Sequence, residues 1–317
     1  MIIFIDSIIF ESLKYAMEDH RLKAFCLLIE MKSFSKAAEA KFMTQSAMSH
    51  LIKNLEDELG VKLLNRKGKT VIPTSAGRIF YEHAKQILDQ YRKLENDVYS
   101  IVEKVKGTLY IGASTTAAIY LLPQVFYNFS KDYPQVQIEL LVSNTEGIIQ
   151  DLHEGKIDIG IVEGKIRSSK AFLEDIAEDE IVIIASEDNP LTKTKSLKSY
   201  DLTSQPFIMP EVGSGMREFI DDFFQATNIN TKDINILMTL GNPELIVQMV
   251  QSGIGISFVS KWSVFKAIKD GSIKLLHISD KKLKRKFYLV SLEGEPSTLV
   301  IKTFREFIKG YRFFMPF

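Results

Sequence analysis

The sequence predicts a multidomain α/β protein, and three observations along its 317 residues lead to this prediction. A small helical region with a basic hairpin comes first. One long helix with a regular apolar seam follows it. From there to the end of the chain, strands and helices alternate, which is the pattern of an α/β domain.

Three helices are predicted at the start of the chain. Apolar residues spaced three and four apart predict the first helix over His20–Lys32. A short second helix follows, with Ser35 as its capping residue and Phe42 on its core side. Thr44 is then expected to cap a third helix that ends at Gly60. Two helices with so short a break between them are typical of a helix-turn-helix.

A basic hairpin is predicted directly after these helices. Residues 61–74, VKLLNRKGKTVIPT, read as two short strands around the tip RKGK. From Lys41 to Thr70, six lysines and arginines stand against three acids, whereas the whole chain has a formal net charge of +0. The acids cluster at the far end of the third helix. The positive charge is therefore segregated, as contact with DNA phosphates requires.

The start of the third helix carries polar side chains of the kind that read base edges. In a helix-turn-helix these positions enter the major groove, where Gln pairs with adenine and Ser donates or accepts a hydrogen bond. On an isolated helix such a face would be solvated surface, but the adjacent basic hairpin favours contact with double-stranded DNA. The expected DNA-binding residues are Ser35, Lys36, Thr44, Gln45, Ser46, Ser49, His50, Lys53, Arg66 and Lys69.

One long helix is predicted from Ala76 to Lys106, with Thr74 as its cap. Its apolar residues recur at alternating steps of four and three, which is a heptad seam. At a rise of 1.5 Å per residue the helix is about 45 Å long, enough to leave one domain and pair with its copy. A buried core helix would also carry an apolar stripe, but so regular a seam favours a dimeric coiled coil. The seam consists of Phe80, Ala84, Ile87, Tyr91, Leu94, Val98, Ile101 and Val105.

Beyond Gly107 the chain alternates between strands and helices. The runs TLYIGAS, VQIELLV, KIDIGIV and EIVIIAS predict strands of a largely parallel sheet, with helices at Ala118–Tyr133 and Glu146–Glu154. The runs QPFIMP, INILMTL, IGISFVS and KFYLVSL predict a second set, with helices near Met216–Thr227 and Pro243–Ser252. Two α/β lobes of similar size follow from this pattern.

Polar residues gather where several of these strands end. In open α/β sheets ligands bind beyond the carboxyl ends of strands, where helix N-termini present free N–H groups. Taken singly, each residue is more readily explained as a helix cap. Taken together they predict a cleft for a small anion or carboxylate, with Arg217 as its cation. The expected effector-binding residues are Ser114, Thr115, Thr116, Asn144, Thr145, Glu163, Ser214, Arg217 and Asn242.

Composition and motifs exclude several classes of protein. With 45% hydrophobic and 25% charged residues, the chain is neither disordered nor fibrous. The single cysteine, Cys26, excludes an intramolecular disulfide, is expected to be a buried hydrophobe, and fits a reducing cytoplasm. P-loop, dinucleotide-binding, H-E-x-x-H and G-x-S-x-G motifs are absent from the sequence. We therefore expect no enzyme activity, no metal and no cofactor.

The first sixteen residues, MIIFIDSIIFESLKYA, are unusually apolar. They lack the cationic start and the cleavage site of a signal peptide, and they are too short and interrupted for a membrane span. We favour an upstream extension with Met17 as the natural start. A real extra helix or strand is the alternative.

Residues 33–77 are similar to the N-terminal domain of LysR-type transcriptional regulators. The motifs SFSKAAE, TQSAMS, LEDELGVKLLNR and PTSAG carry this resemblance, in family order and without gaps. His50 departs from the pattern, because many members have Arg there, which leaves the base preference at this position open. A histidine also predicts some pH dependence of DNA affinity, since imidazole titrates near neutrality.

The resemblance implies a winged helix-turn-helix, a dimerising linker helix, frequent assembly as a tetramer, and an effector domain similar to type 2 periplasmic binding proteins. It also suggests the domain boundaries. They are 1–16 for a possible extension, 17–75 for the winged helix-turn-helix, 76–107 for the linker helix, 108–183 with 294–317 for the first lobe, and 184–293 for the second lobe.

We therefore expect the protein to be a cytoplasmic transcriptional regulator that does not bind a membrane. It binds promoter DNA as a homodimer or homotetramer, responds to a small anionic effector and acts on the transcription machinery. The alternative is a solute-binding or enzymatic α/β protein whose first hundred residues serve assembly only. Salt-dependent binding to the protein's own promoter region separates the two.

Overall fold

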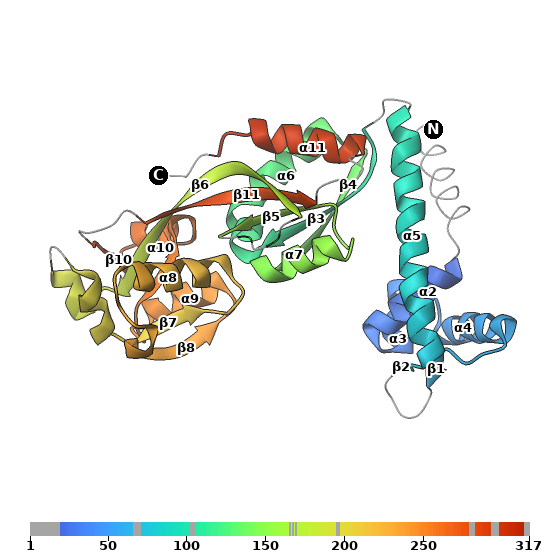
Figure 1. Cartoon of the computed structure of the whole chain (residues 1–317), viewed down its shortest axis with the longest axis horizontal. Coiled ribbons are helices and arrows are strands. Elements are labelled where there is room, and N and C mark those ends of the chain that lie inside the picture. Colours follow the sequence, from blue (N-terminus) through green and yellow to red (C-terminus); the bar gives the residue numbers. More distant parts are fainter. Residues whose placement is uncertain are drawn as a thin grey trace. The chain divides into compact units, whose positions relative to one another are not determined.

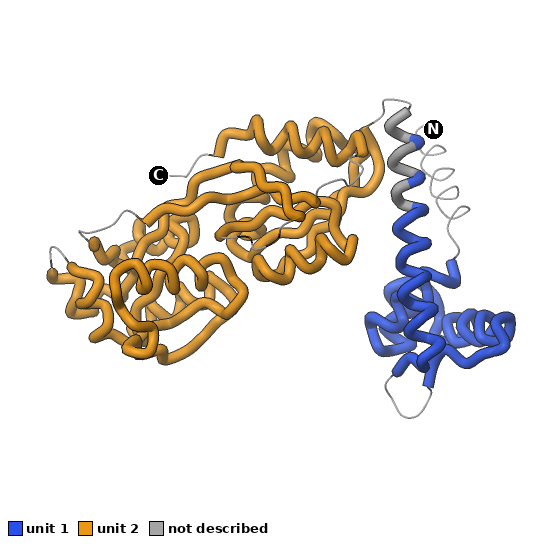
Figure 2. Tube along the Cα trace, viewed as in Figure 1, with its two compact units in different colours: residues 1–98 blue, residues 99–317 orange. Residues whose placement is uncertain are grey.

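The computed structural model describes residues 20–65, 71–101, 105–164, 166, 168, 170–194, 197–278, 283–292 and 298–313. The chain divides into two compact units, Met1–Val98 and Tyr99–Phe317 (Figure 2). No helix within the described ranges has both the length and the hydropathy needed to cross a membrane.

The described residues of unit 1 form three helices, a two-stranded hairpin and the start of a long helix (Figure 1). The hairpin strands pair antiparallel, and the residues between them, 66–70, lie outside the described ranges. This is the predicted order of a winged helix-turn-helix. The elements are α2 (His20–Met31), α3 (Phe34–Ala40), α4 (Gln45–Leu59), β1 (Leu64–Asn65), β2 (Ile72–Pro73) and α5 (Ser75–Ile101).

The helix caps are mostly as predicted, with one correction. The Oγ atom of Thr44 accepts a hydrogen bond from the N–H of Ala47, and Gly60 ends α4 with a φ of 65°. The prediction that Ser35 caps α3 is wrong. Ser33 is the cap, and its Oγ accepts from the N–H of Lys36. The earlier start places Phe34 inside the helix, where it packs against the core.

The turn between α3 and α4 also corrects the predicted core. Phe42 is fully exposed, with 100% of its surface accessible, and has a φ of 53°. Met43 packs against the core in its place. One residue in the left-handed region advances the apolar pattern by one position, an offset that helical periodicity cannot reveal.

The core of unit 1 lies between α2, α3, α4 and the first turns of α5. Phe25 meets the ring of Phe80 edge-on at 5.0 Å between ring centres. Met48 and Ile52 from α4 are fully buried beside them. Cys26 is buried, as predicted, and desolvation, followed by the charge of Glu30, raises its pKa to about 12. The thiol is therefore protonated near neutrality.

Glu56 links the end of α4 to the hairpin from inside the core. Its Oε1 accepts hydrogen bonds from the N–H groups of Leu63 at 2.9 Å and Leu64 at 3.1 Å, and its Oε2 accepts one from Lys62 at 3.1 Å. The residue is only 1% exposed. Burial alone would raise the pKa of Glu56, but these three hydrogen bonds hold it below its ordinary value. Glu56, one of the three acids at the far end of α4, therefore fixes the hairpin.

The heptad seam of α5 divides into two parts. Ala84 is buried and Phe80 packs on the core of unit 1, whereas Ile87, Leu94 and Val98 are 44–49% exposed. The cap of α5 is Thr74, as predicted, since its Oγ1 accepts from the N–H of Gly77 at 3.0 Å. At the other end the prediction is wrong for Val105, which packs against a core of unit 2.

Unit 2 consists of two α/β lobes joined by long strands (Figure 1). The first lobe uses β3 (Gly107–Ser114), η1 (Ala117–Leu121), α6 (Leu122–Asp132), β4 (Val136–Ser143), α7 (Thr145–His153), β5 (Ile159–Glu163) and α11 (Leu299–Gly310). The second lobe uses β7 (Phe207–Pro210), α8 (Gly215–Ala226), β8 (Ile236–Leu240), α9 (Pro243–Gln251), β9 (Ser257–Ser260), α10 (Phe265–Lys269), β10 (Ile273–Leu276) and the short helices η2 (Pro190–Lys193), η3 (Ser199–Ser204), η4 (Thr231–Asp233) and η5 (Lys261–Ser263).

The joining strands are β6 (Ala171–Ser186) and β11 (Lys284–Leu292). The main sheet has the order β10-β6-β11-β5-β3-β4, with β9 also paired to β6. Strands β4 and β5 run parallel to β3, as do β7 and β8 to each other, but every pairing of β6 and β11 is antiparallel. The largely parallel sheet predicted from the sequence is thus confined to the strands that alternate with helices.

The joining strands contribute to both cores. Ile181 and Ile183 of β6 lie in a core of the second lobe, whereas Phe287 and Leu289 of β11 lie in the core of the first. The chain has therefore returned to the first lobe by Phe287 rather than at residue 294. From Phe287 on, β11 is mostly buried and reads like any other core strand, so its lobe cannot be read from its sequence.

Substitution of Glu56 tests its role in unit 1. We expect Glu56→Gln to lower the free energy of unfolding by about 1–3 kcal/mol, because two backbone N–H groups lose a charged acceptor. Since the folded-state pKa of Glu56 is depressed, its stabilisation is complete above the ordinary glutamate pKa and is lost as pH falls through the folded-state value. Thermal unfolding near neutrality and at about pH 3.5 measures this. Wild type should lose more stability on acidification than Glu56→Gln, and the exposed neighbour Asp57→Asn is the control. Equal pH dependence of wild type and Glu56→Gln would contradict the assignment.

Candidate functional site

The first site is the exposed surface around the start of α4. Ser35 donates a hydrogen bond from Oγ to Oε1 of Gln45 at 3.1 Å, which leaves the NH₂ group of Gln45 as a donor. Thr44 and Ser46 share a hydroxyl hydrogen bond of 3.0 Å. These contacts orient the side chains at the helix start before any partner binds.

The next turn of α4 continues this surface. His50 Nδ1 and Asn54 Nδ2 lie 3.3 Å apart, so the amide donates to Nδ1 and the proton of a neutral ring is on Nε2. Lys53 is exposed beside them, and Ser49 is half-buried. Lys36 on α3 is exposed as well, and the Ser35–Gln45 hydrogen bond joins the predicted residues of α3 to the start of α4. The predicted contacts Arg66 and Lys69 lie outside the described residues.

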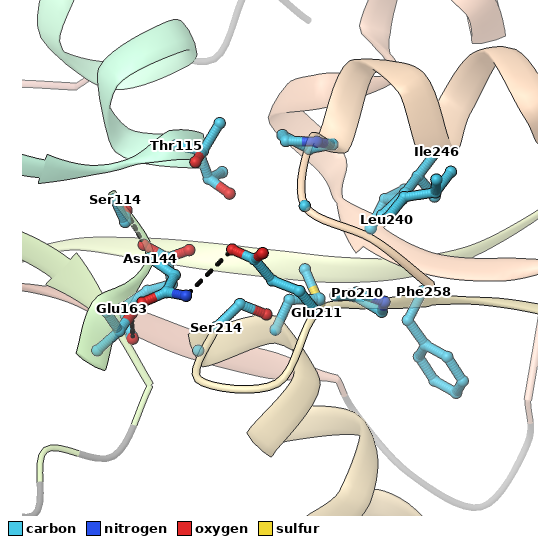
Figure 3. A pocket seen from close by; sticks show the side chains of 17 residues that line it. Ser114, Thr115, Asn144, Glu163, Pro210, Glu211, Ser214, Leu240, Ile246 and Phe258 are labelled. Carbon is cyan, nitrogen blue, oxygen red and sulfur yellow. Dashed lines mark hydrogen bonds between the residues drawn. The ribbon is translucent and has the colours of Figure 1, made fainter. Parts of the chain in front are cut away.

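The second site is a pocket between the two lobes of unit 2 (Figure 3). Its cavity volume is about 40 Å³. Of the predicted residues, all but Arg217 and Asn242 line it. The lining residues are Ser114, Thr115, Thr116, Asn144, Thr145, Glu163, Pro210, Glu211, Ser214, Gly215, Met216, Leu240, Gly241, Pro243, Ile246, Phe258 and Val259.

Helix starts surround this pocket. Ser114 Oγ accepts from the N–H of Ala117 at 3.3 Å, Asn144 caps α7, and Ser214 caps α8. The caps of α7 and α8 accept the N–H groups of Gly147 and Arg217, and the carbonyl oxygen of Gly213 accepts that of Glu146, so the two helix starts contribute chiefly the partial positive charge of their helix dipoles. The apolar side of the pocket is formed by Leu240 and Ile246 in the second lobe.

Two predicted residues have other roles. Arg217 Nε donates to both carboxylate oxygens of Asp221, at 3.1 and 3.2 Å, one turn along α8. Asn242 caps α9, and its Oδ1 accepts from the N–H groups of Glu244 and Leu245. Asp221 lies four residues after Arg217 in the same helix, and this spacing in the sequence predicts their ion pair.

Glu211 is the functional candidate that the sequence analysis missed. It directly follows β7, at the kind of strand end used to select the other residues, and its Oε1 accepts a hydrogen bond from Asn144 Nδ2 at 3.1 Å. The N–H of Glu146 donates to the carbonyl oxygen of Gly213 at 3.1 Å beside it. Residues 144–146 of the first lobe and 211–213 of the second are therefore in direct contact.

Glycines allow β5 and the start of α8 to approach closely beside this contact. A Cβ atom at Gly215 would lie 2.0 Å from the carbonyl oxygen of Glu163. Gly164, which has a φ of 94°, lies against Gly215. A side chain at Gly215 would push β5 and α8 apart.

A buried charge cluster lies beneath the pocket. Arg285 of β11 donates from Nε to Asp179 of β6 at 2.8 Å, and its NH1 lies 3.5 Å from Glu163 of β5. Ser114 donates to the other oxygen of Glu163, and Ser260 of β9 donates to Asp179 at 2.6 Å. The three charged side chains are 0–4% exposed. Removing one member of such a cluster costs about 3–5 kcal/mol, because the others stay charged and buried.

A second contact joins the lobes at another point. Tyr120 lies in η1, a single turn of π-helix, and its hydroxyl bonds to Glu244 at the start of α9. Burial, followed by the charge of Glu244, raises the pKa of Tyr120. π-helical turns are frequent at functional sites. Within the described residues, no group of three or more His, Cys, Asp or Glu side chains is placed to hold a metal ion.

Comparison with known families now assigns the chain. Residues 20–78 match the family described as "Bacterial regulatory helix-turn-helix protein, lysR family", and residues 103–312 match "LysR substrate binding domain". The chain belongs to the LysR family of transcriptional regulators. The predicted family and fold are thereby confirmed.

Individual relatives agree with this assignment. The HTH-type transcriptional regulator CysL of Bacillus subtilis (strain 168) is 33% identical over 265 residues, which cover 84% of this chain and 88% of that protein. The CcmR regulatory domain of Synechocystis PCC6803, solved in complex with 2-PG, is 26% identical with a TM-score of 0.59, and the match covers 64% of this chain and 95% of that one. Full-length CbnR in complex with its target DNA has a TM-score of 0.68 at 20% identity, covering 92% of this LysR-type chain and 99% of CbnR, and shows the fold alone.

Two variants of α4 separate base readout from phosphate contact. We expect Gln45→Ala to cost about 1–3 kcal/mol on the operator and to relax its sequence preference, since an amide pairs with base edges. Lys53→Ala should weaken binding to all DNA and lower the slope of log affinity against log salt by about 1. Fluorescence anisotropy with operator and unrelated DNA at several salt concentrations measures both. Lys131→Ala, which removes an exposed cation on α6, is the control. Equal losses on both DNAs for Gln45→Ala would contradict base readout.

Proposed function

We propose that this LysR-type regulator binds promoter DNA as a homodimer or homotetramer and changes its DNA binding when a small effector enters the pocket between the lobes. We further propose that it acts in the cytoplasm on the transcription machinery, without enzyme activity or a cofactor. The single observation that carries this proposal is the pocket, where polar groups and helix starts from both lobes meet. A ligand that touches both lobes selects one arrangement of them.

An acid group on the effector is part of this proposal. Arg217 does not support it, since that side chain is paired with Asp221. Its support comes from the starts of α7 and α8 and from the hydroxyls of Thr115 and Ser214 in the pocket wall. The CcmR domain is named with 2-PG bound, and the QuiR effector-binding domain is named with shikimate bound. The CcmR domain and the QuiR domain each match 64% of this chain.

Oligomerisation is supported by two apolar surfaces. Ile87, Leu94 and Val98 of α5 are 44–49% exposed at heptad spacing, which suits a coiled coil. Strand β4 ends the main sheet in the pairing order, and its Leu140, Leu141 and Val142 are 40–47% exposed. An apolar edge strand is a ready surface for a second copy. Two such surfaces on one chain suit a dimer that pairs again to a tetramer.

Binding to the chain's own upstream DNA tests the proposed function. The full-length protein should bind this region in gel-shift assays, with affinity that falls as salt rises. Compounds that raise its melting temperature by binding the folded state should then alter the footprint. They should lose their effect on Thr115→Val and Ser214→Ala but keep it on Glu187→Gln, which lies outside the pocket. A protein with no salt-dependent DNA binding would support the alternative, in which unit 1 serves assembly only.

A single charged substitution tests whether the seam of α5 is the dimer contact. Leu94→Lys should lower the association constant of the dimer at least tenfold and weaken operator binding, because an ammonium group would be buried in the coiled coil. Analytical ultracentrifugation measures the change. Ile79→Lys replaces a residue of α5 that is 59% exposed but lies off the seam, and it should leave the mass unchanged. If Leu94→Lys keeps the wild-type mass, α5 is not the dimer contact.

A further inference from the structure

The charged side chains of the pocket are all carboxylates. Among the described residues that line it, Glu163 and Glu211 are acidic and none is Lys, Arg or His. Arg217 is held by Asp221 and does not line the cavity. An effector with only negative groups would therefore meet two like charges at close range.

The cation beneath the pocket does not reverse this balance. Arg285 is shared between Glu163 and Asp179, so the buried cluster keeps one carboxylate in excess. Glu163 is further committed to Ser114. Seen from the cavity, the floor is negative.

Glu211 has the capacity to accept a cationic ligand group. Its Oε1 accepts from Asn144 Nδ2, whereas its Oε2 accepts no hydrogen bond within the described part of the chain. Figure 3 shows this carboxylate reaching from its loop toward Asn144 on the opposite lobe. An ammonium group has three donors and can satisfy both oxygens of a carboxylate. A ligand with such a group would engage Glu211 at the contact between the lobes.

The opposite requirement comes from the helix starts. The starts of α7 and α8 are the positive ends of their helix dipoles and favour a negative group in the same cavity. The cavity has about 40 Å³, and a water molecule needs about 10–15 Å³ of such space, so opposite charges must lie close together on a small ligand.

We propose that the effector is a compact zwitterion of the amino-acid type, with its carboxylate at the helix starts of α7 and α8 and its ammonium group at Glu211 beside Glu163. This inference rests on the proposed function of the pocket and names the ligand class that it takes. A dicarboxylate or a phosphate has no cationic group to donate to the second oxygen of Glu211. A simple amine lacks the anion that the helix starts favour.

Matched ligands test the ammonium group on the wild-type protein. The full chain is titrated by calorimetry with a panel of proteinogenic and non-proteinogenic α-amino acids. Each is compared with the 2-hydroxy acid and with the amine that share its side chain. We expect at least one amino acid to bind at least tenfold more tightly than both partners. An equally tight hydroxy acid, or no binding by any amino acid, would overturn the proposal.

Two variants test whether Glu211 is the residue that recognises the ammonium group. Glu211→Gln should weaken the amino acid at least tenfold and abolish its advantage over the hydroxy acid, whereas Glu187→Gln, an exposed acid paired with Lys274, should not. If Glu211→Gln retains the full preference, the assignment to Glu211 is wrong. Gel shifts on the same preparations separate the two proposals. DNA binding without any amino-acid binding defeats only the zwitterion, and absence of DNA binding defeats the proposed function itself.

Discussion

The architecture of the effector unit depends on one buried interaction, the pairing of Arg285 with Asp179 and Glu163. These side chains come from β11, β6 and β5, the strands that meet where the chain crosses between the lobes. Charges with so little exposure are tolerated only when paired, so the three strands are held in one register. The same cluster supports Ser114 through Glu163, and Ser114 caps the first turn after β3. The same charge cluster thus stabilises both the crossing point and the wall of the pocket above it.

The pocket combines groups that favour opposite ligand charges. Helix starts from both lobes provide partial positive charge, and Glu163 and Glu211 provide carboxylates. The lobes already touch through Asn144 and Glu211, so a ligand that competes for this hydrogen bond acts directly on the contact between them. A contact with two alternative partners is the kind of element that a ligand can switch. Under the proposed function of this LysR-type regulator, Asn144 and Glu211 are the residue pair that links ligand charge to lobe geometry.

The sequence was sufficient for elements fixed by local periodicity and capping. Thr44 and Gly60 bound α4 as predicted, and most of the predicted pocket residues line one cavity. The sequence was insufficient where tertiary packing decides between local alternatives. Ser33 and Ser35 are equally good caps, and only the packing of Phe34 decides between them. Glu56 looks like surface charge until the backbone of the hairpin is placed against it, and β11 cannot be assigned to a lobe before its partners are known. Arg217 was expected in the pocket but is held by Asp221 one turn along α8, whereas Glu211 directly follows β7 and was not among the predicted residues.

We propose that the pocket and the DNA-binding surface are energetically coupled. Coupling is reciprocal: a ligand that changes operator affinity by some factor must have its own affinity changed by the same factor when operator is bound. The most direct measurement is the dissociation constant of a pocket ligand for the full chain, free and saturated with operator DNA. Coupling predicts two different values, with a ratio equal to the change in operator affinity at saturating ligand. Identical values, with ligand binding abolished by a pocket variant, would show a pocket that is occupied but has no influence on DNA binding.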